Sequence, residues 1–254
     1  MLANHPAIEM YPVHRVPASR PFIWLGEGWR DMHYHRAASY AYGALVTGLG
    51  MLILAYSRHP LSLAATVAAF LMVGPLMAAG LCELSRRRDH GESTSFAASL
   101  QGLRSNRGNL LAFAGVLLLS ALAWFTLCGL FLYAMTGSIG PAIGDTVWGD
   151  VMSHLSSAQL AAYVLAFALL CLVVYAVSVV TVPMIIDRHV DVGTAVRMSL
   201  RVTEKDFPAM LVWAGLILVL VLFGFATGLL GMIVILPLLG HATWHAYRDT
   251  VEEA

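Results

Sequence analysis

The sequence contains little charge. Only 12% of its 254 residues are Asp, Glu, Lys or Arg, whereas 59% are hydrophobic and the mean hydropathy is +0.74. Soluble domains carry roughly 25% charged residues. So few charged side chains cannot cover the surface of a soluble protein of this length, and we expect lipid to surround most of the chain. The net charge is zero, which argues against a nucleic-acid partner.

Lysine, cysteine and catalytic motifs are also scarce. Lys205 is the one lysine among 15 basic residues. The cysteines form no C-x-x-C pair, so we predict buried structural thiols at Cys82, Cys128 and Cys171. Phosphate-binding P-loops, His-Glu-x-x-His and serine nucleophile elbows do not occur. These absences favour a protein that is not an enzyme and has no cofactor.

Apolar runs of membrane-spanning length are what the sequence does contain. A bilayer core of about 30 Å requires roughly 20 apolar helical residues. Six stretches meet this length: 38–56, 61–83, 109–135, 158–186, 208–227 and 229–247. Residues 1–21 hold four prolines and no apolar core, so we interpret them as an extended cytoplasmic segment. The remainder, 22–254, is predicted to be a single six-helix transmembrane domain.

The basic residues fall on one side of the predicted membrane. Fourteen of them lie before the first span, between spans two and three, between spans four and five, or after the last span. Arg58 alone lies on the other side, and the long connection 136–157 has no Lys or Arg. The positive-inside rule then places both termini in the cytoplasm and 136–157 outside.

A threefold pattern recurs along the chain. A short amphipathic segment with an apolar–Arg step precedes spans one, three and five, and a glycine follows in each span: Gly43, Gly115 and Gly215. The second span of each pair contains a proline: Pro75, Pro183 and Pro237. We therefore predict an all-α membrane protein of three parallel pseudo-repeats, each preceded by a cytoplasmic interfacial helix.

The amphipathic segments also predict which side chains share a face. The three sets are Phe22, Leu25, Trp29 and Met32 in the first segment, Phe96, Leu100 and Leu103 in the second, and Ala195, Met198 and Val202 in the third, opposite Arg197 and Arg201. Helices of this kind lie in the membrane interface with arginine toward phosphate.

Candidate chemistry gathers at the cytoplasmic ends of the spans. No ionisable residue lies in the middle of any span, which argues against ion-coupled transport. His241 and His245 are four residues apart, so both imidazoles share one helix face and could bind zinc. Glu83 occupies the matching position of the second span and is the candidate third ligand. We favour the alternative without metal, in which these interfacial histidines pack or hydrogen-bond, with Glu83 as the partner of His245.

Four segments carry a family resemblance: GWRD, GPLMAAGLCELSRR, VVTVPMIIDRHVDVGTAVRMSLR and ILPLLGHATWHAYRD. Together, from about Phe22 to Asp249, they resemble a bacterial family of predicted integral membrane proteins of unknown function. Some of its members carry the label cytochrome c oxidase. A haem–copper subunit needs several mid-membrane histidines, and the spans predicted here contain none.

These observations predict a multi-pass protein of the bacterial inner membrane without a catalytic site. We expect an accessory or assembly subunit of a larger membrane complex, which the resemblance suggests is respiratory. Its partners would be the lipid bilayer and either another membrane protein or further copies of the chain. Two alternatives stay open: a channel or carrier for a small or lipophilic molecule, and a metal- or haem-handling protein that uses His241 and His245.

Overall fold

The computed structural model describes residues 11–56, 77–136 and 156–251. Within these ranges the regular structure is helical, apart from one isolated bridge between Val13 and Val251, so the all-α class is confirmed. Residues 77–89 are helical. The other helices are α2 (Arg20–Tyr34), α3 (Arg36–Tyr56), α5 (Phe96–Ser105), α6 (Arg107–Thr136), α9 (Ser157–Ser178), α10 (Thr181–Arg188), α11 (Val192–Lys205), α12 (Phe207–Ala226) and α13 (Met232–Thr250).

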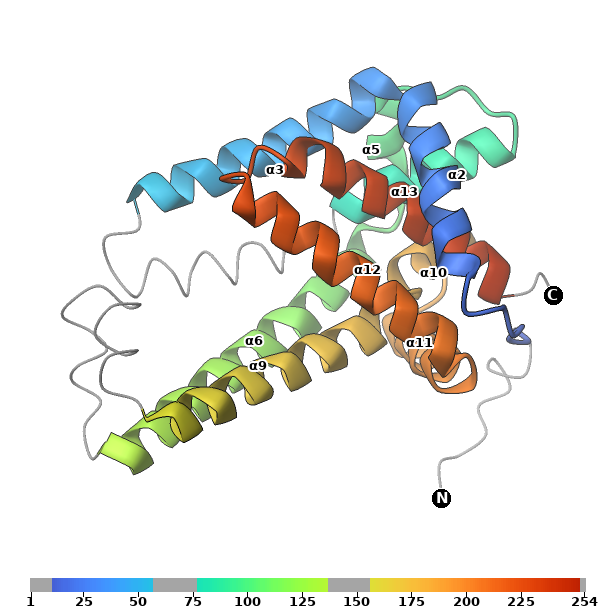
Figure 1. Ribbon diagram of the computed structural model, residues 1–254. Helices are drawn as coiled ribbons and strands as arrows, with labels where there is room; N and C mark the ends of the chain where they lie inside the picture. The colour runs from blue at the N-terminus through green and yellow to red at the C-terminus, as the bar shows by residue number, and fades with distance from the viewer. Residues whose placement is uncertain (1–10, 57–76, 137–155, 252–254) are drawn as a thin grey trace.

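The short helices gather at one end of the molecule, and the long helices extend from it (Figure 1). α6 and α9 run away from this end side by side, and they expose leucines such as Leu119 (67% exposed) and Leu165 (73% exposed). Among the described residues, Cys171–Arg188 and Phe207–Ala226 are long and apolar enough to cross a membrane. The count of six spans includes stretches outside the described ranges and stays a prediction.

One non-helical residue joins each short amphipathic helix to the long helix that follows. These residues are His35, Asn106 and Asp206, with φ/ψ of −107/40, −106/13 and −119/39. Each donates its backbone N–H to the carbonyl four residues earlier, and each is buried. The predicted order of short helix followed by long helix is therefore present three times, with the same backbone geometry at each junction.

The predicted apolar set of α2 is divided between the surface and the core. Phe22 and Trp29 are exposed, but Met32 is fully buried together with Trp24. The reason is the packing of α2 against α13, which selects the face that contains Gly28. A Cβ at Gly28 would lie 2.7 Å from the backbone nitrogen of Ala242, so the two helices approach more closely there than any larger residue allows.

On α11 the predicted face is confirmed. Ala195, Met198 and Val202 are buried, and Arg197 and Arg201 lie on the opposite side. The apolar face packs into the protein core beside α9 and α10.

Two prolines of the repeat pattern, Pro183 and Pro237, lie in the described residues and have different effects. The predicted span 158–186 is interrupted at Val179 and Val180, shortly before Pro183, so α9 and α10 are separate helices. Ser199 of α11 bridges the interruption, since its hydroxyl donates to the Ala176 carbonyl (2.7 Å) and accepts the Val180 N–H (3.4 Å). Pro75, the third proline of the pattern, lies outside the described residues.

Pro237, by contrast, lies inside the continuous helix α13. Proline has no N–H, so the carbonyl of Ile233 lacks its usual helical donor. Gly43 of α3 packs directly on that carbonyl: a Cβ there would lie 2.7 Å from the carbonyl carbon and nearer still to its oxygen. Gly115 and Gly215, the corresponding glycines of the pattern, have open space where a Cβ would go among the described residues.

The thiols do not all follow the prediction. Cys82 is buried and donates to the Gly240 carbonyl at 3.6 Å. Cys171 is exposed, because it lies on the outward face of α9. The side chain of Cys128 is not among those that the structure describes.

Candidate functional site

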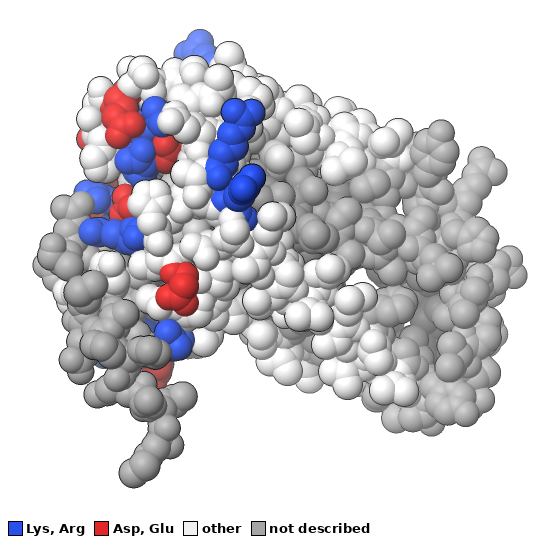
Figure 2. Space-filling view, turned by 180° about the vertical axis from the view of Figure 1, so that it is seen from behind, with Lys and Arg blue, Asp and Glu red and all other residues white. Residues whose placement is uncertain are grey.

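The charged side chains visible from behind concentrate at one end of the molecule, the end where the short helices gather (Figure 2). The C-terminal half of α13 runs through this end and contacts α2 and α3. Its sequence GHATWHAYRD therefore brings two histidines, a tryptophan and a tyrosine against polar groups from distant parts of the chain.

Asp31 of α2 is the centre of a buried polar cluster. Its side chain is only 3% exposed, and it accepts a hydrogen bond of 2.5 Å from the Ser85 hydroxyl. His245 Nε2 lies 3.0 Å from the same carboxylate oxygen, and Arg88 forms an ion pair with the other oxygen. Burial alone would raise the pKa of Asp31, but the hydrogen bonds from His245 and Ser85 outweigh burial and lower it to about 2.

His241 is fully buried on the same face of α13, one turn before His245. Its Nδ1 lies 2.8 Å from the Ser85 hydroxyl oxygen, and its Nε2 lies 2.9 Å from the hydroxyl of Ser39 in α3. Ser85 has one proton and gives it to Asp31, so its oxygen accepts from His241 Nδ1–H. A neutral ring, which full burial favours, then accepts the Ser39 proton at Nε2.

The cluster therefore forms a directed chain of hydrogen bonds from Ser39 through His241 and Ser85 to Asp31. Serine, histidine and aspartate in sequence resemble the parts of a hydrolase triad. However, Ser39 is 0% exposed, so its hydroxyl cannot meet a substrate. The arrangement instead connects α3, α13, residues 77–89 and α2 through groups that satisfy one another.

Two further histidines lie beside this series of hydrogen bonds. His245 also lies 3.5 Å from a Glu27 carboxylate oxygen, so its ring is placed between two acidic residues of α2. The ring of His35 stacks near His241 at a centroid distance of 6.2 Å. His35 Nε2 is buried without a hydrogen-bond partner among the described residues, and burial lowers the pKa of His35, which favours its neutral form.

We predicted that Glu83 faces His245, but the structure does not place it there. Its carboxylate receives hydrogen bonds from Arg86 (2.8 and 3.0 Å) and Arg87 (2.6 Å) on its own helix. Its side chain packs against Gly102 of α5, where a Cβ would lie 2.7 Å from Glu83 Cγ. The acidic partner of His245 is Asp31, because α2 and not the helix of residues 77–89 supplies the carboxylate at that depth.

Other polar residues of α13 also bind carboxylates from separate elements. The Trp244 indole donates to Asp89 at 2.7 Å, and the Tyr247 hydroxyl donates to Asp187 at 2.7 Å. The carboxylate of Asp249 accepts from the Trp24 indole at 2.6 Å. The end of α13 is therefore held to α2, to α10 and to the end of residues 77–89 by directed bonds.

His189 lies apart from this cluster. It follows α10 in a left-handed conformation, with φ of 52°, and its Nδ1 lies 2.8 Å from Asn106 Oδ1. The contact connects the segment after α10 to the junction between α5 and α6.

The predicted metal ligands are brought together only in part. His241 and His245 share a face but bind different partners, and Glu83 is committed to two arginines. Within the described ranges, no three His, Cys, Asp or Glu side chains are arranged as a metal site. Asp31 was not among the residues singled out from the sequence, and its position one helical turn after Glu27 was the available signal.

The comparisons with known proteins bear on the central part of the chain. No curated protein and no solved structure matches the chain. A family model matches the part of the chain that contains α5, α6, α9 and residues 77–89. The match does not include α2 or α13, which contribute Asp31, His241 and His245. Residues 63–187 match the model of the family described as predicted integral membrane protein (DUF2189), whose function is unknown, and the resemblance inferred from the sequence is thereby confirmed.

Proposed function

We propose that the protein is a non-catalytic, multi-pass subunit of the bacterial inner membrane that serves a larger membrane complex as an accessory or assembly component. The observation that supports this proposal is a contrast between the buried polar side chains and the exposed apolar side chains. The buried ionisable groups around Asp31 bind one another, whereas many apolar side chains of α6 and α9, such as Leu119 and Leu165, are turned outward. Outward apolar surface is available to lipid or to another membrane protein.

The proposed orientation has both termini in the cytoplasm. The basic asymmetry of the sequence supports it, as does the concentration of charge at one end of the molecule (Figure 2). The two described ends of the chain also lie together, since Val13 bridges Val251 and the His14 N–H donates to the Thr250 carbonyl at 3.0 Å. The predicted outer connection, 136–157, falls almost entirely outside the described residues.

The threefold arrangement and the interfacial helices are part of the same proposal. The matching junctions at His35, Asn106 and Asp206 support three related units. The exposed Phe22 and Trp29 on α2 support contact of that helix with the membrane interface, where tryptophan is favoured. No described feature gives comparable support to a channel or to metal handling.

Site-specific photo-crosslinking in intact membranes tests this function. A photoreactive residue is placed at Leu165 or Leu169, both exposed on α9, and at Leu218 on α12 as a matched exposed position. We expect the α9 positions to give a reproducible adduct with one membrane protein. If every position gives lipid adducts alone, or adducts with many unrelated proteins, the subunit role is wrong. Elemental analysis of the same purified sample tests the metal-handling alternative.

A further inference from the structure

The hairpin formed by α12 and α13 is shorter than the helix beside it. Its turn lies against α3 well before the end of that helix (Figure 1), where the Thr47 hydroxyl donates to the Leu229 carbonyl at 3.3 Å. From Thr47, α3 continues to Tyr56, which adds about 13 Å at a rise of 1.5 Å per residue. The turn is therefore held partway along a helix whose 21 residues are long enough to cross a bilayer core of about 30 Å.

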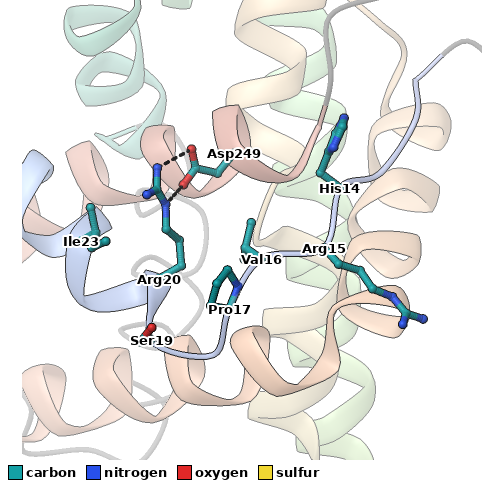
Figure 3. A pocket seen from close by; sticks show the side chains of 8 residues that line it. All are labelled: His14, Arg15, Val16, Pro17, Ser19, Arg20, Ile23 and Asp249. Carbon is teal, nitrogen blue, oxygen red and sulfur yellow. Dashed lines mark hydrogen bonds and ion pairs between the residues drawn. The ribbon is translucent and has the colours of Figure 1, made fainter.

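The opposite ends of both helices are fixed in the polar end of the molecule by the N-terminal segment, which Figure 3 shows from close by. The His14 N–H donates to the Thr250 carbonyl in the last turn of α13 at 3.0 Å. Two residues later, the Val16 N–H donates to the carboxylate of Asp206, which directly precedes α12, at 3.1 Å. Because α12 begins and α13 ends in the same place, the lengths of the two helices determine how far their turn extends from the polar end.

Neither helix has enough length beyond the polar end to cross the membrane. On α13 the buried polar side chains begin at His241, which leaves residues 232–240, a length of about 13 Å. On α12 the Trp213 ring packs edge-on against Trp24 of α2, with 5.8 Å between the ring centroids. Beyond this contact α12 has residues 214–226, a length of about 20 Å. If α2 lies in the membrane interface, both lengths end inside a core of about 30 Å.

The chemistry of the turn suits an apolar surrounding. It contains no charged residue, and each backbone N–H from Thr227 to Ile233 donates to an acceptor within the hairpin at 2.8–3.3 Å. A turn in water can leave such groups to the solvent, whereas hydrocarbon offers them no acceptor. Phe225, just before the turn, and Leu230, within it, are 56% and 59% exposed. The tip of the hairpin therefore combines a satisfied backbone with outward apolar side chains.

We propose that the tip of the α12–α13 hairpin is a lipid-contacting surface inside the bilayer, where Phe225 and Leu230 meet acyl chains and the turn does not reach the outer solution. The inference rests on the proposed function, which places the polar end at the cytoplasmic surface. It changes the predicted spans 208–227 and 229–247 into one re-entrant hairpin. Because such a hairpin returns to the side from which it starts, both termini stay on the same side of the membrane.

Electron paramagnetic resonance of the full-length protein in phosphatidylethanolamine–phosphatidylglycerol vesicles tests the depth of the tip. A spin-labelled noncanonical amino acid replaces Leu230, and the same label replaces Leu165, an exposed leucine of α9, or Glu92, an exposed residue of the polar end. Dissolved O₂ concentrates in hydrocarbon, whereas the nickel chelate NiEDDA stays in water. We expect the ratio of O₂ to NiEDDA collisions at Leu230 to match that at Leu165 and to exceed that at Glu92 severalfold. A ratio at Leu230 as low as that at Glu92 would overturn the proposal.

A second labelled position guards against a folding defect. The label at Phe225, which is exposed to a similar degree, should give the same high ratio, and it decides the question if the Leu230 variant fails to unfold cooperatively on heating.

The orientation of the protein is tested separately. Ser138→Cys, in the predicted outer connection, should react with a membrane-impermeant maleimide in intact cells above the level of the wild type. Lack of reaction would contradict the proposed orientation alone, because the ratio of O₂ to NiEDDA collisions does not depend on which side of the membrane faces outward. A low ratio at the tip together with reaction at Ser138→Cys would contradict the re-entrant hairpin alone.

Discussion

The polar end of the molecule and the pair α6 and α9 are stabilised by different kinds of contact. At the polar end, the side chains of Asp31 and His241 are buried and bond only to side chains of other elements. The packing of these elements therefore depends on the direction and length of a few hydrogen bonds. Along α6 and α9, leucines such as Leu119 and Leu165 point outward and need only an apolar surrounding. Specificity of the fold is therefore concentrated in a few polar contacts, and the extended helices tolerate more change.

The largest effect should follow from removal of the central carboxylate. Asp31→Ala removes the ion-pair partner of Arg88 and leaves the largely buried His245 with only the more distant Glu27. Removing one partner of a buried ion pair typically costs about 3–5 kcal/mol, and the partial exposure of Arg88 places the expected loss toward the lower end. We expect a fall of many degrees in the thermal unfolding temperature, measured in detergent by intrinsic fluorescence. Glu27→Gln, at the more exposed acidic neighbour of His245, should have a much smaller effect. Equal losses would mean that the cluster does not organise the polar end.

Acid should weaken the polar end through the same group. The pKa of Asp31 is lowered in the folded protein to about 2 from an ordinary value of 3.8, so its ionised form stabilises the fold. That contribution, about 2 kcal/mol, is present above pH 4 and is lost as the pH falls toward 2. The stability difference between wild type and Asp31→Asn should therefore shrink over this interval. A difference that stays constant down to pH 2 would contradict the assignment.

Gly43 offers a steric test at the boundary of the two regions. Gly43→Ala places a methyl group against the Ile233 carbonyl of α13, and we expect a loss of about 1–3 kcal/mol from overpacking. Gly115→Ala is the matched control on α6, where a methyl group meets open space. That variant should be neutral or more stable by about 0.5–1 kcal/mol, because alanine favours helix more than glycine does. Thermal unfolding of both variants decides the point.

A double-mutant cycle sharpens the correction at His245. His245→Ala and Asp31→Asn should be coupled by about 1 kcal/mol, since the two side chains are in direct contact. His245→Ala and Glu83→Gln should be additive, because Glu83 binds Arg86 and Arg87 instead. Coupling in the second pair and additivity in the first would restore the original prediction.

The smallest effect is expected on the extended helices. Leu165→Ala removes a side chain that is 73% exposed on α9, and the free energy of unfolding in detergent should change by less than about 0.5 kcal/mol. A loss comparable to that of Asp31→Ala would show that a protein surface packs on Leu165. The measurement therefore also bears on the proposed partner contact.

Local patterns predicted the helices better than they predicted their partners. The spacing of Ala195, Met198 and Val202 was sufficient for the buried face of α11, because a single helix determines which residues share a side. The same reasoning could not tell that Met32 is buried while Phe22 is exposed, since the choice of buried face on α2 depends on Gly28 and on α13, more than 200 residues later.

Glu83 illustrates a second limit. It was paired with His245 because equal spacing from a proline suggested equal depth. Depth along a helix does not fix rotation about it, and two adjacent arginines supply a nearer partner. Asp31 was missed because one acidic residue in an amphipathic segment resembles a solvated one until the opposing helix is known.

The contact between Asp31 and His245 has a consequence for how the chain matures. The two residues are 214 positions apart, so that length of chain must be synthesised before the contact can form. Before α13 is present, Asp31 can bond only to Ser85 and Arg88, and residues 13–17 lack their bonds to Thr250 and Val251. A chain truncated before Met232 should therefore keep an incompletely packed polar end, and partly folded chains of this kind are prone to aggregation.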